Sequence, residues 1–330
     1  MRHFILSALL ATALTAQIKQ EFIYEKAPFP ECHASTLVEV APGEIYAAWF
    51  GGTREGAKDV AIWGARRVNG KWSAPVEIAR EPGHSTYNPV LFFTKDKTLW
   101  MYYKFGSHPT RWNGAKVRST DGGKTWGGKE YLAAGVYGPI KNKPLVLGDG
   151  AIVSGTSVET DFAWTAWVER STDNGKTWTK HGPIEFPSEP RGVIQPAMAM
   201  HGKTMRMYLR STEKIGAIAY SDSRDGGKTW SPAKATKLPN PNSGIDTVTL
   251  KDGRTVLIYN HTAKGRSPLN IAVTKDGETW SAPLALETEP GEYSYPAIVQ
   301  AADGSVHATW TWKRKKVKYA IIPLYALPKP

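Results

Sequence analysis

One short motif returns along this chain at a nearly fixed interval, and it constrains the fold more than any other feature. Full copies of the pattern Ser-x-Asp-x-Gly-x-Thr-Trp occupy residues 119–126, 171–178 and 223–230, and a shortened copy occupies residues 274–280. The tryptophans that end these copies lie about fifty residues apart, and a degenerate copy ending at Trp72 extends the series toward the N-terminus. Self-similarity at this period is typical of propellers and solenoids. We therefore interpret the chain as an array of similar units.

The motif itself predicts a structural turn. Its aspartate can accept hydrogen bonds from backbone N–H groups just ahead of it, and its glycine can adopt the positive φ of a tight connection. The tryptophan offers a large apolar face that packs the turn against its unit. Because a copy occurs in most units and an active site is single, we exclude these aspartates from the candidate catalytic residues.

The segments between the motifs show strand patterning. Residues 44–50 and 204–209 are short runs that mix apolar and polar residues, and Gly, Pro, Asn and Asp separate such runs. Four strands in each unit predict an all-β fold, a six-bladed β-propeller of antiparallel strands in a single domain over residues 17–330. We expect residues 18–30 to help close the ring against a final strand at 317–322. The six units span residues 31–74, 84–128, 137–180, 193–232, 243–282 and 292–323.

Residues 1–16 have the pattern of a secretory signal peptide, with a basic start, an apolar run and small residues at the end. We therefore expect a secreted or periplasmic protein. No later run is long and apolar enough to predict a membrane span. Cys32 is the single cysteine, so an intrachain disulfide is excluded.

The charge of the chain favours an acidic partner. Lys and Arg number 42 against 30 Asp and Glu, and the chain also carries 13 Trp and 14 Tyr. No nucleic-acid motif is present, so we expect an acidic glycan or polysaccharide as the substrate and no nucleic-acid partner. The alternative, that the lysines serve solubility alone, stays open. The histidines lack the spacing of a zinc site, so we expect no metal and no cofactor. We also expect a monomer.

Each unit opens with a short polar signature that the scaffold does not require. In a propeller, the start of each innermost strand lines one mouth of the central channel, so these openings should converge in space. The openings are residues 32–35, 84–89, 138–144, 192–196, 240–246 and 292–296. Their candidate substrate-binding residues are His84, Tyr87, Asn88, Lys141, Asn142, Asp246 and Tyr293.

With these motifs and openings, the mature chain resembles the sialidase superfamily, the Asp-box or BNR-repeat propellers. That family is known for three arginines that grip the substrate carboxylate, a tyrosine nucleophile assisted by a glutamate, and an aspartate acid/base. The resemblance implies that Arg210 and Arg266 are the second and third arginines and that Tyr295 is the nucleophile. Guanidinium groups suit this task because each can bind a carboxylate in a bidentate way. Arg314 is a further candidate for the pocket.

The chain departs from the family at two positions. His33 stands where the first arginine is expected, and Gln195 stands where the glutamate is expected. An amide cannot act as a base, so activation of the tyrosine must differ from the family's manner. The acid/base aspartate corresponds to Asp59 or to Glu55.

The first hypothesis is an exo-glycosidase that hydrolyses a terminal acidic sugar, sialic acid or a related ulosonic or uronic acid. Arg210 and Arg266 would hold the carboxylate, and Asp59 or Glu55 would protonate the leaving oxygen. Tyr295 would attack or stabilise the anomeric carbon, with His33 as the base.

Two alternatives remain. A polysaccharide lyase would cleave a uronic-acid linkage, such as rhamnose to glucuronate, by β-elimination. In that lyase, Arg210, Arg266 or Lys141 with Asn142 neutralise the carboxylate. His33 or His84 takes the proton, and Tyr295 or Tyr87 protonates the leaving oxygen.

The second alternative is a glycan-binding propeller without turnover. It would use aromatic rings as platforms on which sugars stack. The candidates are Trp49, Trp63, Trp112 and Trp310.

Overall fold

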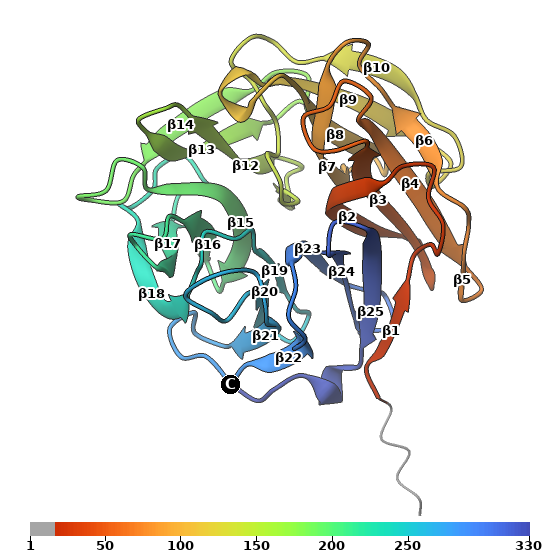
Figure 1. The fold of residues 1–330 in the computed structure, drawn as a ribbon. Coiled ribbons are helices and arrows are strands. Elements are labelled where there is room, and N and C mark those ends of the chain that lie inside the picture. The colour runs from red at the N-terminus through yellow and green to blue at the C-terminus, as the bar shows by residue number, and fades with distance from the viewer. Residues whose placement is uncertain (1–16) are drawn as a thin grey trace, which may run out of the picture.

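The computed structural model describes residues 17–330 as six antiparallel β-sheets arranged around a central axis (Figure 1). Five sheets have four strands, and the sheet of the first blade has a fifth short strand. The predicted all-β, six-bladed β-propeller is therefore confirmed. The expected signal peptide, residues 1–16, lies outside the described residues. Within residues 17–330, no helix has the length and apolar character needed to cross a membrane.

Each blade is a meander that runs from the central channel to the rim. Blade 1 contains β2 (Glu31–Ala41), β3 (Glu44–Gly52), β4 (Ala61–Val68), β5 (Lys71–Trp72) and β6 (Val76–Ala79). Blade 2 contains β7 (Ser85–Phe93), β8 (Leu99–Gly106), β9 (Asn113–Ser119) and β10 (Gly127–Tyr131), with the 3-10 helix η1 (Pro109–Arg111) between β8 and β9. Blade 3 contains β11 (Leu145–Val146), β12 (Ile152–Glu159), β13 (Trp164–Ser171) and β14 (Thr179–Ile184).

The second half of the chain repeats this order. Blade 4 contains β15 (Val193–His201), β16 (Thr204–Ser211), β17 (Ala217–Ser223) and β18 (Lys234–Pro239). Blade 5 contains β19 (Asp246–Thr249), β20 (Thr255–Tyr259), β21 (Leu269–Thr274) and β22 (Leu284–Glu287). Blade 6 contains β23 (Tyr293–Gln300), β24 (Val306–Trp312), β25 (Lys316–Ile322) and β1 (Lys19–Phe22), and the 3-10 helix η2 (Leu324–Ala326) follows.

The N-terminal strand closes the ring as expected. β1 pairs antiparallel with β25, from Lys19 opposite Ile321 to Phe22 opposite Lys318. Within β1, Glu21 accepts hydrogen bonds from Arg67 Nε at 2.7 Å and from Trp72 Nε1 at 2.8 Å. These contacts tie the strand to blade 1 as well, so β1 joins the first blade to the last.

The repeated motifs form the turns between the third and fourth strands of blades 2 to 5. In the copy at residues 119–126, Asp121 Oδ1 accepts hydrogen bonds from the backbone N–H groups of Lys124 and Thr125, each at 3.0 Å. Ser119 Oγ accepts from the backbone N–H of Gly123 at 2.8 Å. The other copies repeat these contacts, which confirms the predicted structural role.

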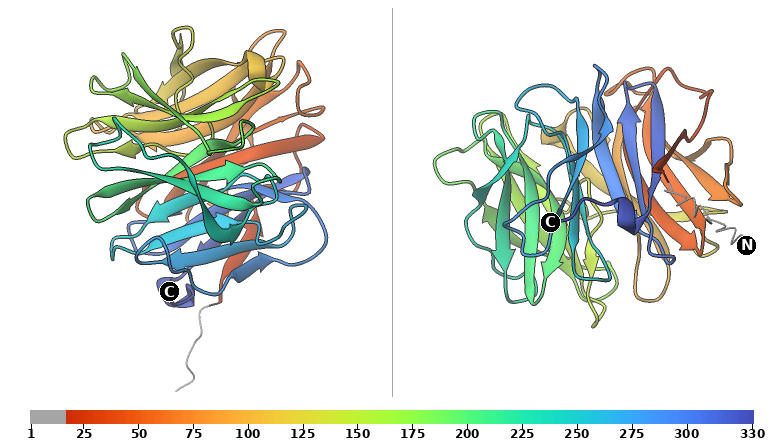
Figure 2. Two further views of the ribbon diagram at one scale, coloured as in Figure 1. Left: turned by 90° about the vertical axis from the view of Figure 1, so that its left-hand side faces the viewer. Right: turned by 90° about the horizontal axis from the view of Figure 1, so that it is seen from below.

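The expected unit boundaries fall short at the outer edge of five blades. The unit that ends at residue 74 stops before β6, and the units that end at 128 and 180 cut through β10 and β14. The units drawn at 193–232 and 243–282 end before β18 and β22, the outermost strands, which follow the motif tryptophan. β18 has six residues, half of them exposed, and β22 has only four residues, so neither strand shows the longer alternating apolar pattern that reveals the inner strands. The apolar core lies between neighbouring sheets, which stand side by side in the views of Figure 2.

Bulges in the innermost strands of four blades shape the channel mouth. The register with the second strand shifts between His33 and Thr36, and at equivalent places in β7, β15 and β23. One residue at each bulge has a positive φ, a conformation that non-glycine residues rarely adopt. These residues are Ala34 (55°), Asn88 (41°), Gln195 (55°) and Tyr295 (49°).

Candidate active site

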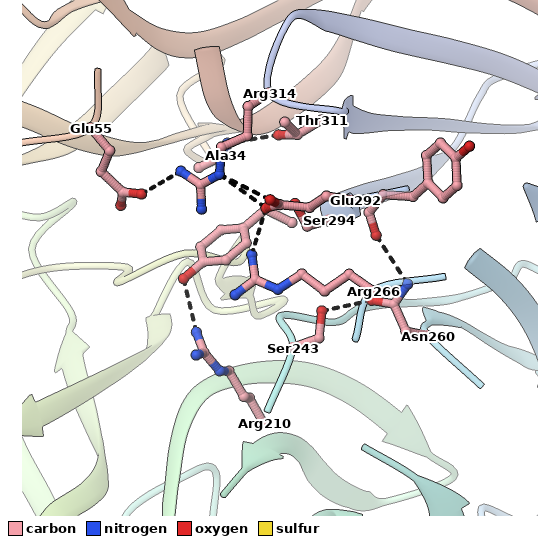
Figure 3. Close-up of polar contacts among 12 residues, drawn as sticks. Ala34, Glu55, Arg210, Ser243, Asn260, Arg266, Glu292, Ser294, Thr311 and Arg314 are labelled. Carbon is pink, nitrogen blue, oxygen red and sulfur yellow. Dashed lines mark hydrogen bonds and ion pairs between the residues drawn. The ribbon is translucent and has the colours of Figure 1, made fainter. Parts of the chain in front are cut away.

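The hydroxyl of Tyr295 is the centre of the polar contacts at the channel mouth. Arg210 Nη1 donates a hydrogen bond to Tyr295 Oη at 2.8 Å (Figure 3). Gln195 Nε2 donates another at 3.2 Å. Arg210 Nε also donates to Asn242 Oδ1 at 2.8 Å, which holds the guanidinium group in place. Two donors from blade 4 therefore fix the position of the phenol oxygen.

His33 packs against the same tyrosine. The two ring centroids lie 4.2 Å apart, and the His33 side chain is buried with no hydrogen-bond partner for Nδ1. Burial, followed by the positive charges of Arg314, Arg266 and nearby groups, holds the pKa of His33 well below its usual range. The imidazole is therefore neutral at physiological pH, with a ring nitrogen available to accept a proton.

Two more arginines form a chain of ion pairs beside Tyr295. Arg314 Nη1 contacts Glu55 Oε2 at 2.6 Å, and Arg314 Nε contacts Glu292 Oε1 at 3.1 Å (Figure 3). Arg266 Nη1 reaches the same Glu292 oxygen at 2.9 Å. Burial acts to raise the pKa of Glu292, but the charges of Arg314 and Arg266 outweigh it and hold that pKa below its ordinary value. Glu292 therefore stays ionised and fixes both guanidinium groups.

Arg314 reaches the site from a turn whose place beside the site cannot be predicted from the spacing of the motifs. Its residue lies between β24 and β25 with a φ of 55°, and its charge acts on the neighbouring His33. Blade 6 thus places a guanidinium group beside the position where blade 1 carries histidine. Glu292 lies inside one of the predicted openings. Its ion pairs with Arg266 and Arg314 join residues that are far apart in the sequence, so local sequence does not predict them.

A pocket of about 270 Å³ opens above Tyr295, and we call it the channel-mouth pocket. The predicted residues that line it are Glu55, Asn88, Gln195, Arg210 and Tyr295. Residues not foreseen as site residues include His108, Glu159, Asp161, Trp164 and Arg191. A larger hollow of about 670 Å³ lies between residues 183–190 and 230–232, and it includes none of the predicted site residues.

Lys141 and Asn142 lie beneath the pocket. Lys141 Nζ donates to the backbone oxygens of Ile245, at 2.8 Å, and Pro296, while Asn142 Nδ2 donates to Gln195 O at 3.1 Å. Burial lowers the pKa of Lys141 to about 7. These contacts link blade 3 to blades 4, 5 and 6, so the pair supports the floor of the site. Nearby, Asp246 pairs with Lys143 at 2.8 Å.

The remaining predicted residues lie away from the pocket lining. Asp59 accepts hydrogen bonds from the backbone and hydroxyl of Thr53, which lower its pKa. His84 is exposed, whereas Tyr87 and Tyr293 are buried between blades. Of the proposed aromatic platforms, Trp112 lines the pocket, Trp49 and Trp310 are fully buried, and Trp63 packs partly buried against the core around Trp49.

No metal centre stands out in the part of the chain that the structure describes. Across residues 17–330, no group of three or more His, Cys, Asp or Glu side chains is placed to hold an ion.

Comparison with known proteins identifies the family of this chain. The model of the BNR repeat-like domain matches residues 43–308. A sialidase of Micromonospora viridifaciens is 29% identical over 224 residues, which are 56% of this chain and 33% of that protein. A sialidase of Bacteroides fragilis (strain YCH46) is 26% identical over 195 residues, 53% of this chain and 35% of that protein. The chain thus spans about a third of the length of these curated relatives.

The solved structures agree on the fold. A sialidase of Streptococcus pneumoniae superposes with a TM-score of 0.77 at 13% sequence identity, over 93% of this chain and 71% of that one. At that identity the likeness concerns architecture. The family match covers most of the chain, and the repeated turns, the ring of blades and the solved folds all agree with it. The chain therefore belongs to the BNR-repeat propellers of the sialidase-like superfamily.

Proposed function

We propose that this protein is an exo-glycosidase that hydrolyses a terminal acidic sugar, sialic acid or a related ulosonic or uronic acid, from a glycan. The observation that carries the proposal is the hydrogen bond of Arg210 to Tyr295 Oη, with Arg266 and Arg314 nearby. The Arg210 and Arg266 guanidinium centres lie 5.8 and 5.7 Å from the centre of the Tyr295 ring. A carboxylate above this ring meets cationic groups suited to bind it.

In this proposal Tyr295 attacks the anomeric carbon and His33 receives its proton. His33 packs against the Tyr295 ring, and its Nδ1 has no hydrogen-bond partner, so it is the nitrogen base beside the nucleophile. Burial and the nearby positive charges lower its pKa and so weaken it as a base. Gln195 serves as a donor that orients the phenol oxygen, since an amide cannot take a proton from it. The leaving oxygen must be protonated by an acid on the wall of the channel-mouth pocket.

A panel of sialylated and uronate-containing glycans tests the proposal. After incubation with folded protein, mass spectrometry should detect a free acidic monosaccharide and a glycan shortened by that residue. A folded protein that releases no acidic sugar from any member of the panel contradicts the proposal. Arg224→Lys, in an exposed motif turn, is a suitable control variant for activity.

One observation favours the lyase as a second candidate. A neutral, unpartnered imidazole beside a tyrosine hydroxyl is also the pair that β-elimination next to a uronate carboxylate needs. His33 would take the proton from the carbon next to the carboxylate, and Tyr295 would protonate the leaving oxygen. The product then contains a new carbon–carbon double bond that absorbs in the near ultraviolet, which hydrolysis does not produce.

We also propose that the protein acts after export, as a monomer, on an acidic glycan. The pattern of residues 1–16 and the net charge of +12 support this. Sizing of the purified mature protein and sequencing of its N-terminus test the two statements.

A further inference from the structure

Two carboxylates that line the channel-mouth pocket, Glu159 and Asp161, have no hydrogen-bond or ion-pair partner among the described residues, and Glu159 is the less exposed of the two. It ends β12 in blade 3 and lines the channel-mouth pocket together with Tyr295 and Arg210. Within residues 17–330, no hydrogen bond or ion pair involves its carboxyl group. Glu55, in contrast, is held by Arg314 at 2.6 Å, and Asp59 by Thr53 at 2.8 and 2.9 Å. Glu159 is therefore a carboxyl group whose oxygens are available to a bound molecule.

The position of Glu159 suits a group that works opposite the nucleophile. Blade 3 carries Glu159 and blade 6 carries Tyr295, and these blades face each other across a ring of six (Figure 1). Both side chains line one pocket of about 270 Å³, with Arg210 from blade 4 between them in ring order. A sugar held by Arg210 above Tyr295 therefore has Glu159 on the opposite wall, on the side where a leaving group can lie.

The surroundings of Glu159 favour its protonated form. Burial raises the pKa of Glu159, and the nearby charge of Arg210 only partly opposes this shift. Asp59 shows the contrary behaviour, because its hydrogen bonds from Thr53 lower its pKa. An acid catalyst must carry its proton at the working pH, and of these two carboxyl groups Glu159 meets that requirement better.

We propose that Glu159 is the general acid of this site, in place of the predicted Asp59 or Glu55. This inference rests on the proposed hydrolysis. In the first step the Glu159 carboxyl proton passes to the glycosidic oxygen, and that oxygen leaves with the electron pair of the broken bond. Tyr295 Oη forms the new bond to the anomeric carbon, and the Tyr295 proton passes to His33.

In the second step water replaces Tyr295 at the anomeric carbon. The water oxygen forms the bond to carbon, its proton returns to the Glu159 carboxylate, and the Tyr295 oxygen leaves with its electron pair. His33 then returns its proton to Tyr295. The sum of both steps is the addition of one water across the glycosidic bond, and every side chain ends in its starting state.

The test compares two glycosides of the same acidic sugar that differ in the leaving group. A nitrophenol departs without protonation, whereas the hydroxyl of a second sugar needs an acid. Glu159→Gln should lower kcat/KM about 100-fold or more for the sugar-linked substrate and less than about tenfold for the nitrophenyl glycoside. It should also remove the fall in activity with the sugar-linked substrate at alkaline pH, because that fall reports loss of the Glu159 proton.

Glu55→Gln and Glu185→Gln serve as comparison variants for Glu159→Gln. Glu185 is exposed at the rim of blade 3, so its variant should retain activity on both substrates and controls for the loss of a carboxylate. Equal losses on both substrates in Glu159→Gln, or a selective loss in Glu55→Gln instead, would overturn the assignment of Glu159 while leaving the hydrolase proposal intact. A wild-type protein that cleaves neither glycoside overturns both.

Discussion

Arg210 of blade 4 donates a hydrogen bond of 2.8 Å to the hydroxyl of Tyr295 in blade 6, across the mouth of the central channel. The two residues are 85 positions apart; Tyr295 lies near the start of the innermost strand β23, and Arg210 lies near the end of the second strand β16. The contact places a permanent positive charge at the oxygen that we propose as the nucleophile. It also leaves the rest of the guanidinium group near the pocket, where an acidic sugar would bind.

Arg210→Lys should lower kcat/KM by about 100-fold on the acidic-sugar substrate. A lysine keeps the charge but cannot contact Asn242 and Tyr295 together while also binding a carboxylate in the bidentate manner. Steady-state kinetics measure the effect, with Arg224→Lys as the matched control. Unchanged kcat/KM in Arg210→Lys would mean that this arginine does not contact the substrate.

His33→Ala should lower kcat by about 100-fold, the contribution expected of a general base. Gln195→Glu should restore a large part of that loss in the double variant, because it places a carboxylate where Gln195 Nε2 now lies 3.2 Å from Tyr295 Oη. The kinetics of the two single variants and the double variant measure this rescue. Full activity in His33→Ala alone contradicts the assigned role.

Asp173→Ala tests whether the repeated motif is structural. Asp173 Oδ1 accepts hydrogen bonds from the backbone N–H groups of Lys176 at 3.1 Å and Thr177 at 2.9 Å. Their loss should lower the thermal midpoint by a few degrees while kcat/KM stays within about twofold of the wild type. Thermal unfolding and kinetics on the same preparation measure both. Loss of activity at an unchanged midpoint would argue for a catalytic role.

The lowered pKa of the buried Lys104 should make the free energy of unfolding depend on pH. Lys104 is fully buried, its Nζ donates to Pro139 O at 2.7 Å, and burial lowers its pKa to about 7 from the ordinary 10.5. Between these values the unfolded chain binds more protons than the folded one, so the free energy of unfolding should rise with pH. Conversely, this stability is lost as the pH falls toward 7.

Lys104→Met should remove about 1.4 kcal/mol per pH unit from that rise, the contribution of one proton. Urea unfolding at several pH values in the window measures the slope for both proteins. Lys141 shifts in the same direction, so part of the rise should remain in the variant. Identical slopes for the wild type and Lys104→Met would contradict the buried, neutral state of Lys104.

The fold could be predicted from the sequence because its signals are local. Asp121 bonds to N–H groups only three and four residues ahead, so the motif carries its own structure and its spacing counts the blades. The outer strands β18 and β22 were not predicted because they are short, with six and four residues. Their pairing depends on the neighbouring strand more than on their own pattern.

The site could be predicted only in part. Tyr295, Arg210 and Gln195 occupy strand positions that the repeat aligns, so their convergence followed from the propeller. The ion pair of Arg314 with Glu55 joins residues 259 positions apart, and no local pattern signals it. Glu159 was missed for a similar reason, because its burial arises from several blades that meet at the pocket.

Cleavage of an acidic-sugar glycoside in water enriched with oxygen-18 tests the central claim most directly. Hydrolysis adds one water to the products, so the released acidic sugar should carry the heavy oxygen in its mass spectrum. Elimination would instead yield an unlabelled product with a double bond that absorbs in the near ultraviolet. Labelled free sugar is the result that we predict for the wild type, with strong loss in Arg210→Lys. An unlabelled, absorbing product, or no product from folded protein, contradicts the proposed hydrolase.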